Sequence, residues 1–468
     1  MSSTTSSSSS SSTSTPYDAV AADVPGPSTR RTGQFEAAGP SSSRQRAMNE
    51  VLPEPILEAL ATQVAVDAAQ NNGRLSAASA LAILFQVCST WREVSRSDLL
   101  WQRLTRRIWR RSYRLRATWQ LEFIYWHRTA RNFATGNLSS NVPQFDPAEQ
   151  HQSLICRCLA LSDTHLACGF VDGTVRLFDL ETLAHVSTYV SAHGHLFGAF
   201  SRSISGIVMV NSVITFARLD GDVYVDFING PGPSQARRAV SGDVVINGVL
   251  VGFAGTARWW VGLYAGIADR AFQIWDARSE ERVFMRGSLT NPETVMGWHM
   301  LTELVEPVGR VRVAEREYVV ACTGSRLVCF NFRNPDVLLS NVRSTAGFVV
   351  GSLDSSHEAF VVVERSGLGT VRHASSFQRL SRFRVRGSVQ GLLGCMNLGY
   401  VLTYSPGPGP GPGPLLRVWD IERAVGRLCV TLGFDAGEAN SMVANERHVA
   451  ISGNDNSINL LDFGVQDP

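Results

Sequence analysis

The chain has 468 residues, of which 44% are hydrophobic and 18% charged, and its formal net charge is only +2. That length allows about three ordinary domains, or a repeat-built domain that exceeds the usual size. A net charge so close to zero provides no overall attraction to nucleic acid or to an acidic membrane surface.

Further classes are excluded by patterns that the sequence lacks. No apolar run approaches the roughly 18 residues of a membrane-spanning helix, and the N-terminus has no basic-then-apolar secretory pattern. The eight cysteines are scattered without a Cys-x-x-Cys pair, which favours reduced, buried thiols over disulfides or a metal site. We therefore expect an intracellular protein without membrane contact and without a metal or other cofactor.

Residues 1–47 are dominated by Ser, Thr, Pro and Gly. Such a composition cannot bury enough apolar surface to offset the entropy of ordering the chain, so it predicts a disordered tail. The many hydroxyl groups are potential phosphorylation sites, but they do not point to one function.

Residues 48–110 predict a small all-α domain. Apolar side chains recur at helical spacing over 56–68, and Asn71-Asn72-Gly73 ends that run. A second helical pattern covers 75–85, and a third apolar stripe covers 100–108.

The same segment carries a recognisable motif. Leu52-Pro53 stands at its start, and Val87-Cys88-x-x-Trp91 is followed by Leu100-Trp101. This pattern resembles an F-box, a helical module that docks on a Skp-type adaptor and through it on a cullin ubiquitin ligase. The 35 residues from Leu52 to Val87 exceed the family norm, with the extra length in the first helix and the turn after it. The adaptor-binding residues that the resemblance implies are Leu52, Pro53, Ile56, Leu57, Val87, Cys88, Trp91, Leu100 and Trp101.

Residues 111–131 predict a linker helix rich in arginine and tryptophan. Trp119, Phe123 and Trp126 fall at i, i+4 and i+7, which is typical of a buried helical stripe with arginine on the wet face. The wider segment 91–131 holds five tryptophans and eleven arginines against three acids, so nucleic-acid binding by stacking and phosphate contact is the alternative. The helical phase favours the buried stripe.

From about residue 150 onward the sequence alternates apolar and polar residues and repeats itself. Each repeat is a strand, a tight turn and a second strand that ends in an anchor position, at 179, 226, 276, 331, 375, 420 and 462. Intervals of 42 to 55 residues are typical of one four-stranded blade per repeat. Two anchors keep the literal Trp-Asp pair, so the repeats resemble degenerate WD repeats. The fold class predicted is mainly β, with a seven-bladed propeller over 132–468, and a ring of six or eight blades is the alternative.

The chain ends soon after the seventh anchor, so the last blade lacks an outer strand. We expect residues 132–147 to supply that strand by pairing with the 449–463 hairpin. Closing the ring in this way leaves no unpaired sheet edge.

Candidate binding residues in the propeller are few, and no catalytic arrangement of Ser–His–Asp, Cys–His or paired carboxylates is evident. Arg176, Arg372 and Arg417 each precede an anchor by three residues, and arginines on a propeller face can hold a phosphorylated segment through bidentate contacts. Arginine is also common at this position in ordinary WD repeats, so a structural role is the alternative. We expect a non-catalytic protein.

The chain from about 49 to 465 also resembles a family of plant F-box/WD-repeat proteins, notably over 49–60, 63–69, 84–101 and 125–130. The resemblance implies the substrate-recognition subunit of a Skp–cullin–F-box ligase, acting in floral and organ-size development. It implies nuclear localisation, with the cytoplasm as a second compartment, and a target such as a growth-limiting repressor complex of the PEAPOD type. The alternative is a transcriptional scaffold that binds proteins with the propeller and DNA with residues 91–131.

All 43 basic residues are arginine. One explanation is an arginine-biased genome. The other is that a ligase subunit without lysine offers its own ligase no ordinary ubiquitin acceptor.

Overall fold

The structure is a computed structural model, which describes residues 53–145, 155–191, 198–228, 232–287, 307–407, 413–433, 437–455 and 457–465. Leu52 and the tail over 1–47 therefore lie outside the described residues, as does most of the 406–414 Gly-Pro segment. Among the helices that it does describe, none combines the length and the apolar character needed to cross a membrane.

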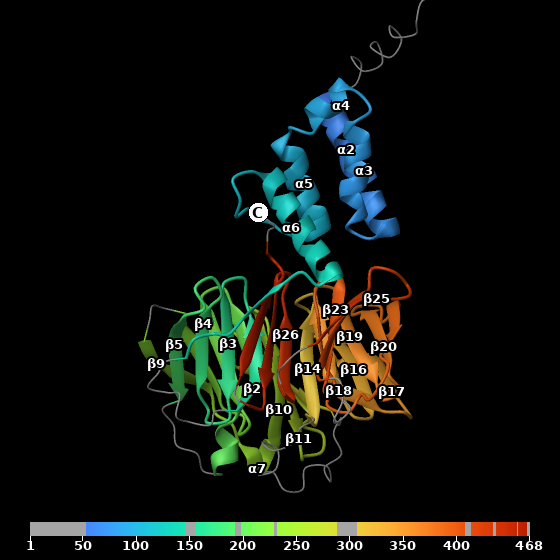
Figure 1. Ribbon diagram of the computed structural model, residues 1–468. Coiled ribbons are helices and arrows are strands. Elements are labelled where there is room, and N and C mark those ends of the chain that lie inside the picture. Colours follow the sequence, from blue (N-terminus) through green and yellow to red (C-terminus); the bar gives the residue numbers. More distant parts are fainter. Residues whose placement is uncertain are drawn as a thin grey trace, which may run out of the picture. The chain divides into compact units, whose positions relative to one another are not determined.

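The described chain begins with a group of helices, labelled in Figure 1. They are α2 (Glu54–Asn72), α3 (Ser76–Phe85), α4 (Ser89–Val94), α5 (Asp98–Trp109) and α6 (Trp119–Thr135). The Ser97 hydroxyl caps α5 by accepting the Leu100 N–H at 3.4 Å, and the Thr118 hydroxyl caps α6 by accepting the Leu121 N–H at 3.2 Å. The linker helix was expected over 111–131. In the structure it begins at Trp119, directly after the Thr118 cap, and ends at Thr135.

In the described residues that follow, strands predominate and form seven four-stranded blades. Blade 1 consists of β2 (Cys156–Leu161), β3 (His165–Phe170), β4 (Val175–Asp179) and β5 (His185–Ser191). Blade 2 consists of β6 (Ile204–Val210), β7 (Val213–Arg218), β8 (Val223–Phe227) and β9 (Gly232–Val240). Blade 3 consists of β10 (Val249–Gly255), β11 (Trp259–Ala265), β12 (Phe272–Asp276) and β13 (Arg282–Arg286). Blades 4 and 5 are β14 (Gly309–Ala314), β15 (Tyr318–Thr323), β16 (Arg326–Asn331), β17 (Asn334–Arg343); and β18 (Phe348–Ser356), β19 (Ala359–Glu364), β20 (Leu368–His373), β21 (Arg379–Arg384). Blades 6 and 7 are β22 (Leu393–Met396), β23 (Tyr400–Ser405), β24 (Leu415–Asp420), β25 (Arg427–Gly433); and β26 (Ala439–Ala444), β27 (His448–Gly453), β28 (Ile458–Asp462), β1 (Ser139–Asn141). Short helices η2 (Ala199–Arg202) and α7 (Val244–Asn247) lie in connections.

The blades are arranged in a ring, which confirms the expected β-propeller. The first strands contact one another in a closed cycle, β2, β6, β10, β14, β18, β22, β26 and back to β2. Within each blade the strands pair in an antiparallel manner, and β5 and β9 add a parallel pairing between blades 1 and 2.

The seventh blade is built from both ends of the propeller sequence. β1 pairs antiparallel with β28, with Ser139 opposite Asp462 and Asn141 opposite Leu460. β1 lies within the 132–147 segment for which ring closure was expected. The pairing gives the β28 edge a partner, which removes an exposed ladder of backbone groups.

The anchor positions can now be compared across blades by strand pairing. In blade 1 the expected anchor Asp179 ends β4 and pairs with the first residue of β3. In blades 2 and 5 the residue that pairs with the first residue of the second strand is not the expected anchor. It is Phe227 in place of Asp226, and His373 in place of Ser375. These two repeats lack an aromatic-Asp pair, so their sequences did not mark the end of the strand.

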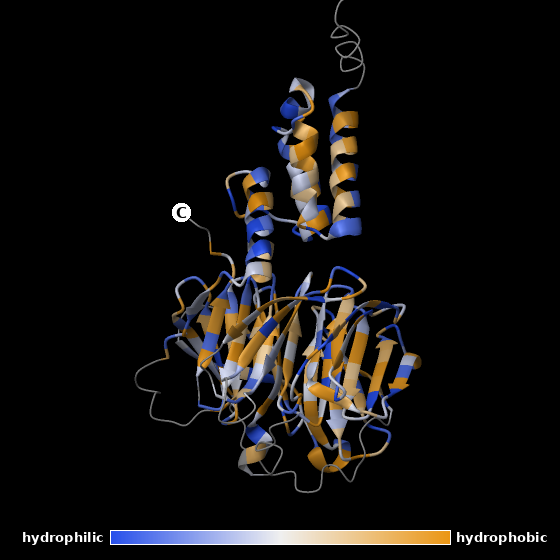
Figure 2. Ribbon diagram, turned by 45° about the vertical axis from the view of Figure 1, so that its right-hand side comes forward, coloured by the Kyte–Doolittle hydropathy of each residue, from blue (hydrophilic) through white to orange (hydrophobic). Residues whose placement is uncertain are grey.

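The core of the propeller lies between neighbouring blades. Middle strands such as β23 are buried along their whole length, since each is covered by an adjacent blade on both faces. Figure 2 shows this distribution, with hydrophobic colour along the strands and hydrophilic colour concentrated in the connecting loops. The buried strands of neighbouring blades therefore form an apolar core that continues around the ring.

Candidate functional site

Helix α2 has two apolar faces. Leu57, Ala61 and Ala65 are buried and pack in the helical core. Ile56, Leu60 and Val64 are instead 45%, 45% and 41% exposed. Their spacing of i, i+4 and i+8 places them on one side of the helix, and we call these three residues the α2 stripe.

A second exposed apolar group lies where α3 ends. Ile83 is 69% exposed, and Val87, just beyond the helix, is 67% exposed. Large apolar side chains that are exposed singly are common, but groups of them on a small helical module indicate an interaction surface.

The structure describes eight of the nine candidate adaptor-binding residues of the sequence analysis, since Leu52 lies outside the described residues. Pro53, Ile56 and Val87 are exposed and available to a partner. Leu57, Leu100 and Trp101 are buried, and Cys88 and Trp91 are half-buried. Leu60 and Val64 were not among the nine, although their helical spacing was visible, because spacing alone does not tell which side of an apolar helix is covered.

The buried Trp101 side chain contacts several of the helices. Its indole N–H donates to the Ser95 carbonyl at 2.7 Å, and its ring lies 5.2 Å from that of Phe123 and 6.1 Å from that of Phe85. The side chain therefore joins α3, α5 and α6. The buried Glu58 carboxylate adds a polar link, since it accepts hydrogen bonds from Ser97 and, at 3.2 Å, from Arg103.

The helices share an apolar core with blades 6 and 7. Phe133 of α6 stacks on Phe463 with ring centroids 3.9 Å apart, and on Tyr400 at 5.5 Å. The Asn132 side-chain amide donates to the carbonyls of Phe463 and Val465, each at 2.8 Å. Residues 53–468 accordingly form one compact unit.

An ion pair fixes the turn between α2 and α3 to blade 6. The Glu422 carboxylate pairs with the Arg74 guanidinium and accepts the Arg74 backbone N–H at 2.9 Å. Gly73 precedes this contact with φ of 90°, and a Cβ there would lie 2.6 Å from a Glu422 oxygen. Only glycine suits both the backbone conformation and the close approach.

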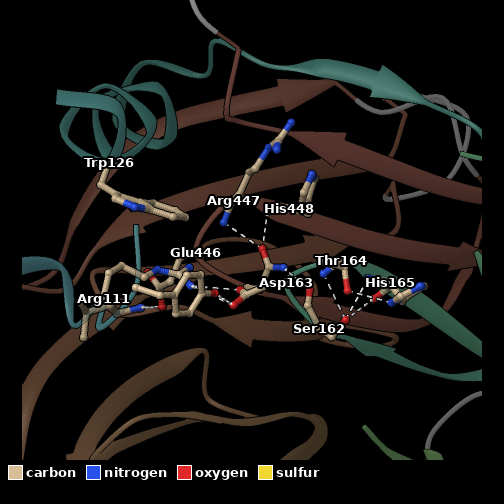
Figure 3. Close-up of polar contacts among 12 residues, drawn as sticks. Arg111, Trp126, Ser162, Asp163, Thr164, His165, Glu446, Arg447 and His448 are labelled. Atoms are coloured by element: carbon tan, nitrogen blue, oxygen red, sulfur yellow. Dashed lines mark hydrogen bonds and ion pairs between the residues drawn. The ribbon is translucent and has the colours of Figure 1, made fainter. Parts of the chain in front are cut away.

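Figure 3 shows a second polar junction, between Arg111 and the loops of blades 1 and 7. Arg111 donates to both Asp163 oxygens at 3.0 and 3.1 Å, and its guanidinium lies 4.0 Å from the centre of the Trp126 ring. Burial opposes the charge of Asp163, but Arg111 and Tyr113 hold the pKa of this carboxyl below its usual value. The same two loops are joined by Asn445, whose amide donates to the Ser162 carbonyl at 2.9 Å.

Most aromatic side chains of the arginine- and tryptophan-rich segment are buried. Trp109, Trp119, Phe123 and Trp126 are between 2% and 8% exposed. Arg106, Arg107 and Arg110 are exposed instead. The aromatic stripe is thus used for packing, which leaves these four rings unavailable for stacking on bases.

The three candidate substrate-binding arginines do not gather. Arg176 is only 4% exposed, and its guanidinium lies 4.8 Å from the centre of the Phe170 ring. Arg372 donates to the Phe377 carbonyl at 3.2 Å, and Arg417 donates to the Ser405 hydroxyl at 2.9 Å. They belong to blades 1, 5 and 6 and each serves its own blade, so the target-binding surface that we propose below does not include them.

One group of possible metal ligands occurs in the described part of the chain. Glu315, Glu358 and His373 bring ligand atoms within 4.8 Å of one another. The two carboxylates lie 3.6 and 3.7 Å from the His373 ring nitrogen, and Arg110 lies 3.5 Å from Glu358. This arrangement is that of a partly exposed ion-pair cluster.

The described residues form seven four-stranded blades around a channel, and three of the repeats end in an aromatic-Asp pair. These features define a WD-repeat β-propeller protein with an N-terminal helical part. Two solved structures share the fold, those described as "Crystal structure of RRP9 WD40 repeats" (TM-score 0.51, 12% identity, 69% of this chain and 97% of that chain) and "Structure of U3-55K" (TM-score 0.50, 11% identity, 69% and 98%). At these identities the likeness concerns the fold alone. No family model matches the sequence.

A curated relative makes the assignment specific. The "Transcriptional regulator STERILE APETALA" of Arabidopsis thaliana is 46% identical over 441 residues, which cover 92% of this chain and 96% of that protein. The chain therefore belongs to the STERILE APETALA family.

Proposed function

We propose that this protein is the substrate-recognition subunit of a Skp–cullin–F-box ubiquitin ligase. In this proposal the helices over 53–109 bind a Skp-type adaptor and through it a cullin, and the propeller binds the protein to be ubiquitinated. The subunit itself performs no catalysis. The observation that carries the proposal is the α2 stripe, an exposed apolar line on a helix whose opposite side is already buried.

The α2 stripe has the form that helical docking requires. Apolar side chains one helical turn apart enter a groove of a partner, and full burial of each contributes about 1.5–3 kcal/mol relative to exposure. Pro53 and Val87, which the F-box resemblance implied as contacts, are also exposed.

The attachment of the helices supports the same function. A receptor must hold its target at a fixed place relative to the adaptor, because ubiquitin transfer needs the acceptor near the enzyme. The Phe133 stacking and the Arg74–Glu422 ion pair link the helical core to the propeller core. We therefore propose that the propeller loops not used in this attachment contact the target.

The class of protein that we propose as the target is inferred from the family to which the chain belongs. The name of the Arabidopsis relative supports a nuclear protein that acts on transcription. From this name and from the resemblance described above, we propose that the target is a growth-limiting transcriptional repressor complex of the PEAPOD type. The protein would then act in floral and organ-size development.

The test is a pull-down of the full-length chain with purified Skp-type adaptor. Leu60→Asp places a charge in the α2 stripe and is expected to weaken adaptor binding at least about 10-fold. Leu339→Asp is the matched control, because Leu339 is also a 45% exposed leucine but lies in β17 of blade 4. It should leave adaptor binding unchanged.

Thermal melts of both variants establish that they remain folded. Equal adaptor binding by wild type and Leu60→Asp would exclude the α2 stripe as the docking surface. Absence of adaptor binding by the wild-type chain would exclude the ligase function.

A second candidate function is a transcriptional scaffold without ligase activity, which the name of the relative favours. It predicts that the protein and its targets form stable complexes whose abundance is insensitive to proteasome inhibition. Under the ligase proposal, inhibition should increase the amount of target captured with the protein.

A further inference from the structure

Exposed arginines follow one another along the outer strand of blade 5. Arg382 and Arg384 lie in β21, Arg386 lies two residues beyond it, and all three are exposed. The residues that precede each of them are buried, namely Ser381, Phe383 and Val385. Because alternate residues of an extended segment point to the same side, the three arginines share one side, at intervals of about 6.7 Å. We call these three residues the β21 row.

Blade 6 holds the backbone of the β21 row in place. The Arg382 N–H donates to the Ala424 carbonyl at 3.1 Å, and the Gly426 N–H donates to the Arg382 carbonyl at 2.7 Å. On the opposite side of β21, the Phe383 ring lies 5.0 Å from that of Trp419. The backbone groups of Arg382 are therefore not free to add another strand, so a partner would meet the arginine side chains.

The positive charge of this region is not balanced by nearby sequence. From residue 365 to residue 419 the chain has seven arginines and no Asp or Glu. In the described part of the chain, no hydrogen bond or ion pair engages the side chains of the β21 row. The same excess of charge acts on a neighbour, since burial, followed by the charge of Arg379, lowers the pKa of Arg372.

Exposed arginines on blades 2, 3 and 4 have acidic partners instead. The pairs are Arg237 with Glu280, Arg286 with Asp336 and Arg333 with Glu317. The first two of these ion pairs join one blade to the next. The β21 row has the same exposed charges without such acids, so carboxylates from another molecule can occupy the equivalent place.

We propose that the β21 row is a docking surface for an extended, acidic segment of a partner protein. Alternate side chains of an extended segment also point to one side at intervals of about 6.7 Å. Asp or Glu at every second position would therefore meet successive arginines of the row. The forked donors of arginine bind a carboxylate through two parallel hydrogen bonds, which gives such pairs both strength and orientation.

The surroundings of the β21 row favour a protein over a strand of nucleic acid. Leu380 and Val425 are 41% and 62% exposed, and Val425 forms a β-bridge with Arg382. Apolar surface beside arginine is typical of protein interfaces. Single-stranded nucleic acid instead stacks its bases on exposed aromatic rings, and the aromatic residue of β21, Phe383, is only 3% exposed.

This docking surface does not depend on the ligase function, because it uses none of the helical residues. Fluorescence anisotropy of the full-length chain tests it, with a labelled peptide that alternates Asp and Thr as the probe, at a salt concentration of about 0.1 M. We expect saturable binding with a dissociation constant of about 100 µM or tighter. The same peptide with Asn in place of Asp should bind at least about 10-fold more weakly.

Three variants locate the binding. Arg382→Gln/Arg384→Gln/Arg386→Gln should weaken binding of the Asp peptide at least about 10-fold, and the corresponding lysine variant, which keeps the charge, should weaken it less. The matched control is Arg237→Gln/Arg286→Gln/Arg333→Gln, which removes three exposed arginines from blades 2, 3 and 4. It should change binding by no more than about 2-fold, since charges further away than a Debye length are screened.

Thermal melts without peptide establish which variants remain folded. Arg384→Gln alone, for which we expect binding to be about 3-fold weaker, keeps the test decisive if the triple glutamine variant does not fold. No saturable signal up to about 300 µM protein would overturn the proposal. Equal binding by the wild type and the β21 row variants, an equal loss in the control variant, or tighter binding of a single-stranded oligonucleotide of the same charge would overturn it as well.

Discussion

At the scale of single residues, His448 is a buried imidazole in blade 7. It is 2% exposed, and its Nε2 lies 3.7 Å from Asp462, whose carboxylate is occupied by Arg447 at 2.6 and 2.8 Å. Burial lowers the pKa of His448 to about 4, against an opposing effect of Asp462. The histidine is therefore neutral in the folded protein at pH values where an unfolded chain already carries the charge.

This difference predicts a pH dependence of stability. Between about pH 6.5 and pH 4 the unfolded state binds a proton that the folded state does not, so the free energy of unfolding falls as the pH is lowered through this window. The loss attributable to His448 is roughly 2–3 kcal/mol. In His448→Gln the curve should be flatter by that amount, which urea unfolding at several pH values measures. Parallel curves for the two proteins would contradict the assignment.

Residue identity alone was a weak guide to the surface that we propose for adaptor binding. Leu57 and Ile56 are adjacent, similar in character and both part of the motif, yet one is 6% and the other 45% exposed. Trp101 belongs to the same motif but is used to join three helices. The distinction depends on what packs against each side of α2, and a local pattern does not contain that information.

At the scale of elements, β1 and β28 decide whether the ring is complete. β28 is the middle partner of both β27 and β1, so its loss leaves two ladders unpaired. Neighbouring blades share their apolar cores, and an incomplete seventh blade would expose those of blades 1 and 6.

Truncation of the chain after residue 457 is therefore expected to abolish the single cooperative melt and most of the soluble yield. Truncation after residue 465 keeps β28 and serves as the control. Calorimetry and size-exclusion chromatography of the two proteins measure the difference. A soluble 1–457 protein with an unchanged melting temperature would show that the ring does not need this strand.

At the scale of the whole molecule, the absence of lysine acquires a consequence under the ligase proposal. Ubiquitin is normally transferred to a lysine ε-amine, and this chain offers only its N-terminal amine, hydroxyls and thiols. Exposed arginines such as Arg286 and Arg333, whose side chains are 74% and 76% exposed, show where a lysine would be accessible.

We expect Arg286→Lys/Arg333→Lys to gain ubiquitin conjugates several-fold over wild type in a reconstituted ligase. The two changes preserve charge, so stability should be nearly unaffected. Mass spectrometry for the diglycine remnant on lysine measures the gain, and formation of free ubiquitin chains confirms that each reaction is active. Equal conjugation of both proteins would mean that the lack of lysine has no protective effect.

The sequence by itself determined the class of fold. Period-two alternation and a recurring interval of 42 to 55 residues are local and repetitive properties, so they predict blades without any knowledge of distant contacts. The helical phase of Trp119, Phe123 and Trp126 likewise predicted their burial. Two anchors were misplaced, at Asp226 and Ser375, because degenerate repeats do not mark where a strand ends.

Only the tertiary structure decided which surfaces are free and which charges converge. The α2 stripe is exposed on its helix, and the Arg74–Glu422 ion pair joins residues that are 348 positions apart in the sequence. Both features arise from packing between elements that are remote along the chain. Such contacts depend on the closure of the ring and the seating of the helices, and no local pattern of residues encodes them.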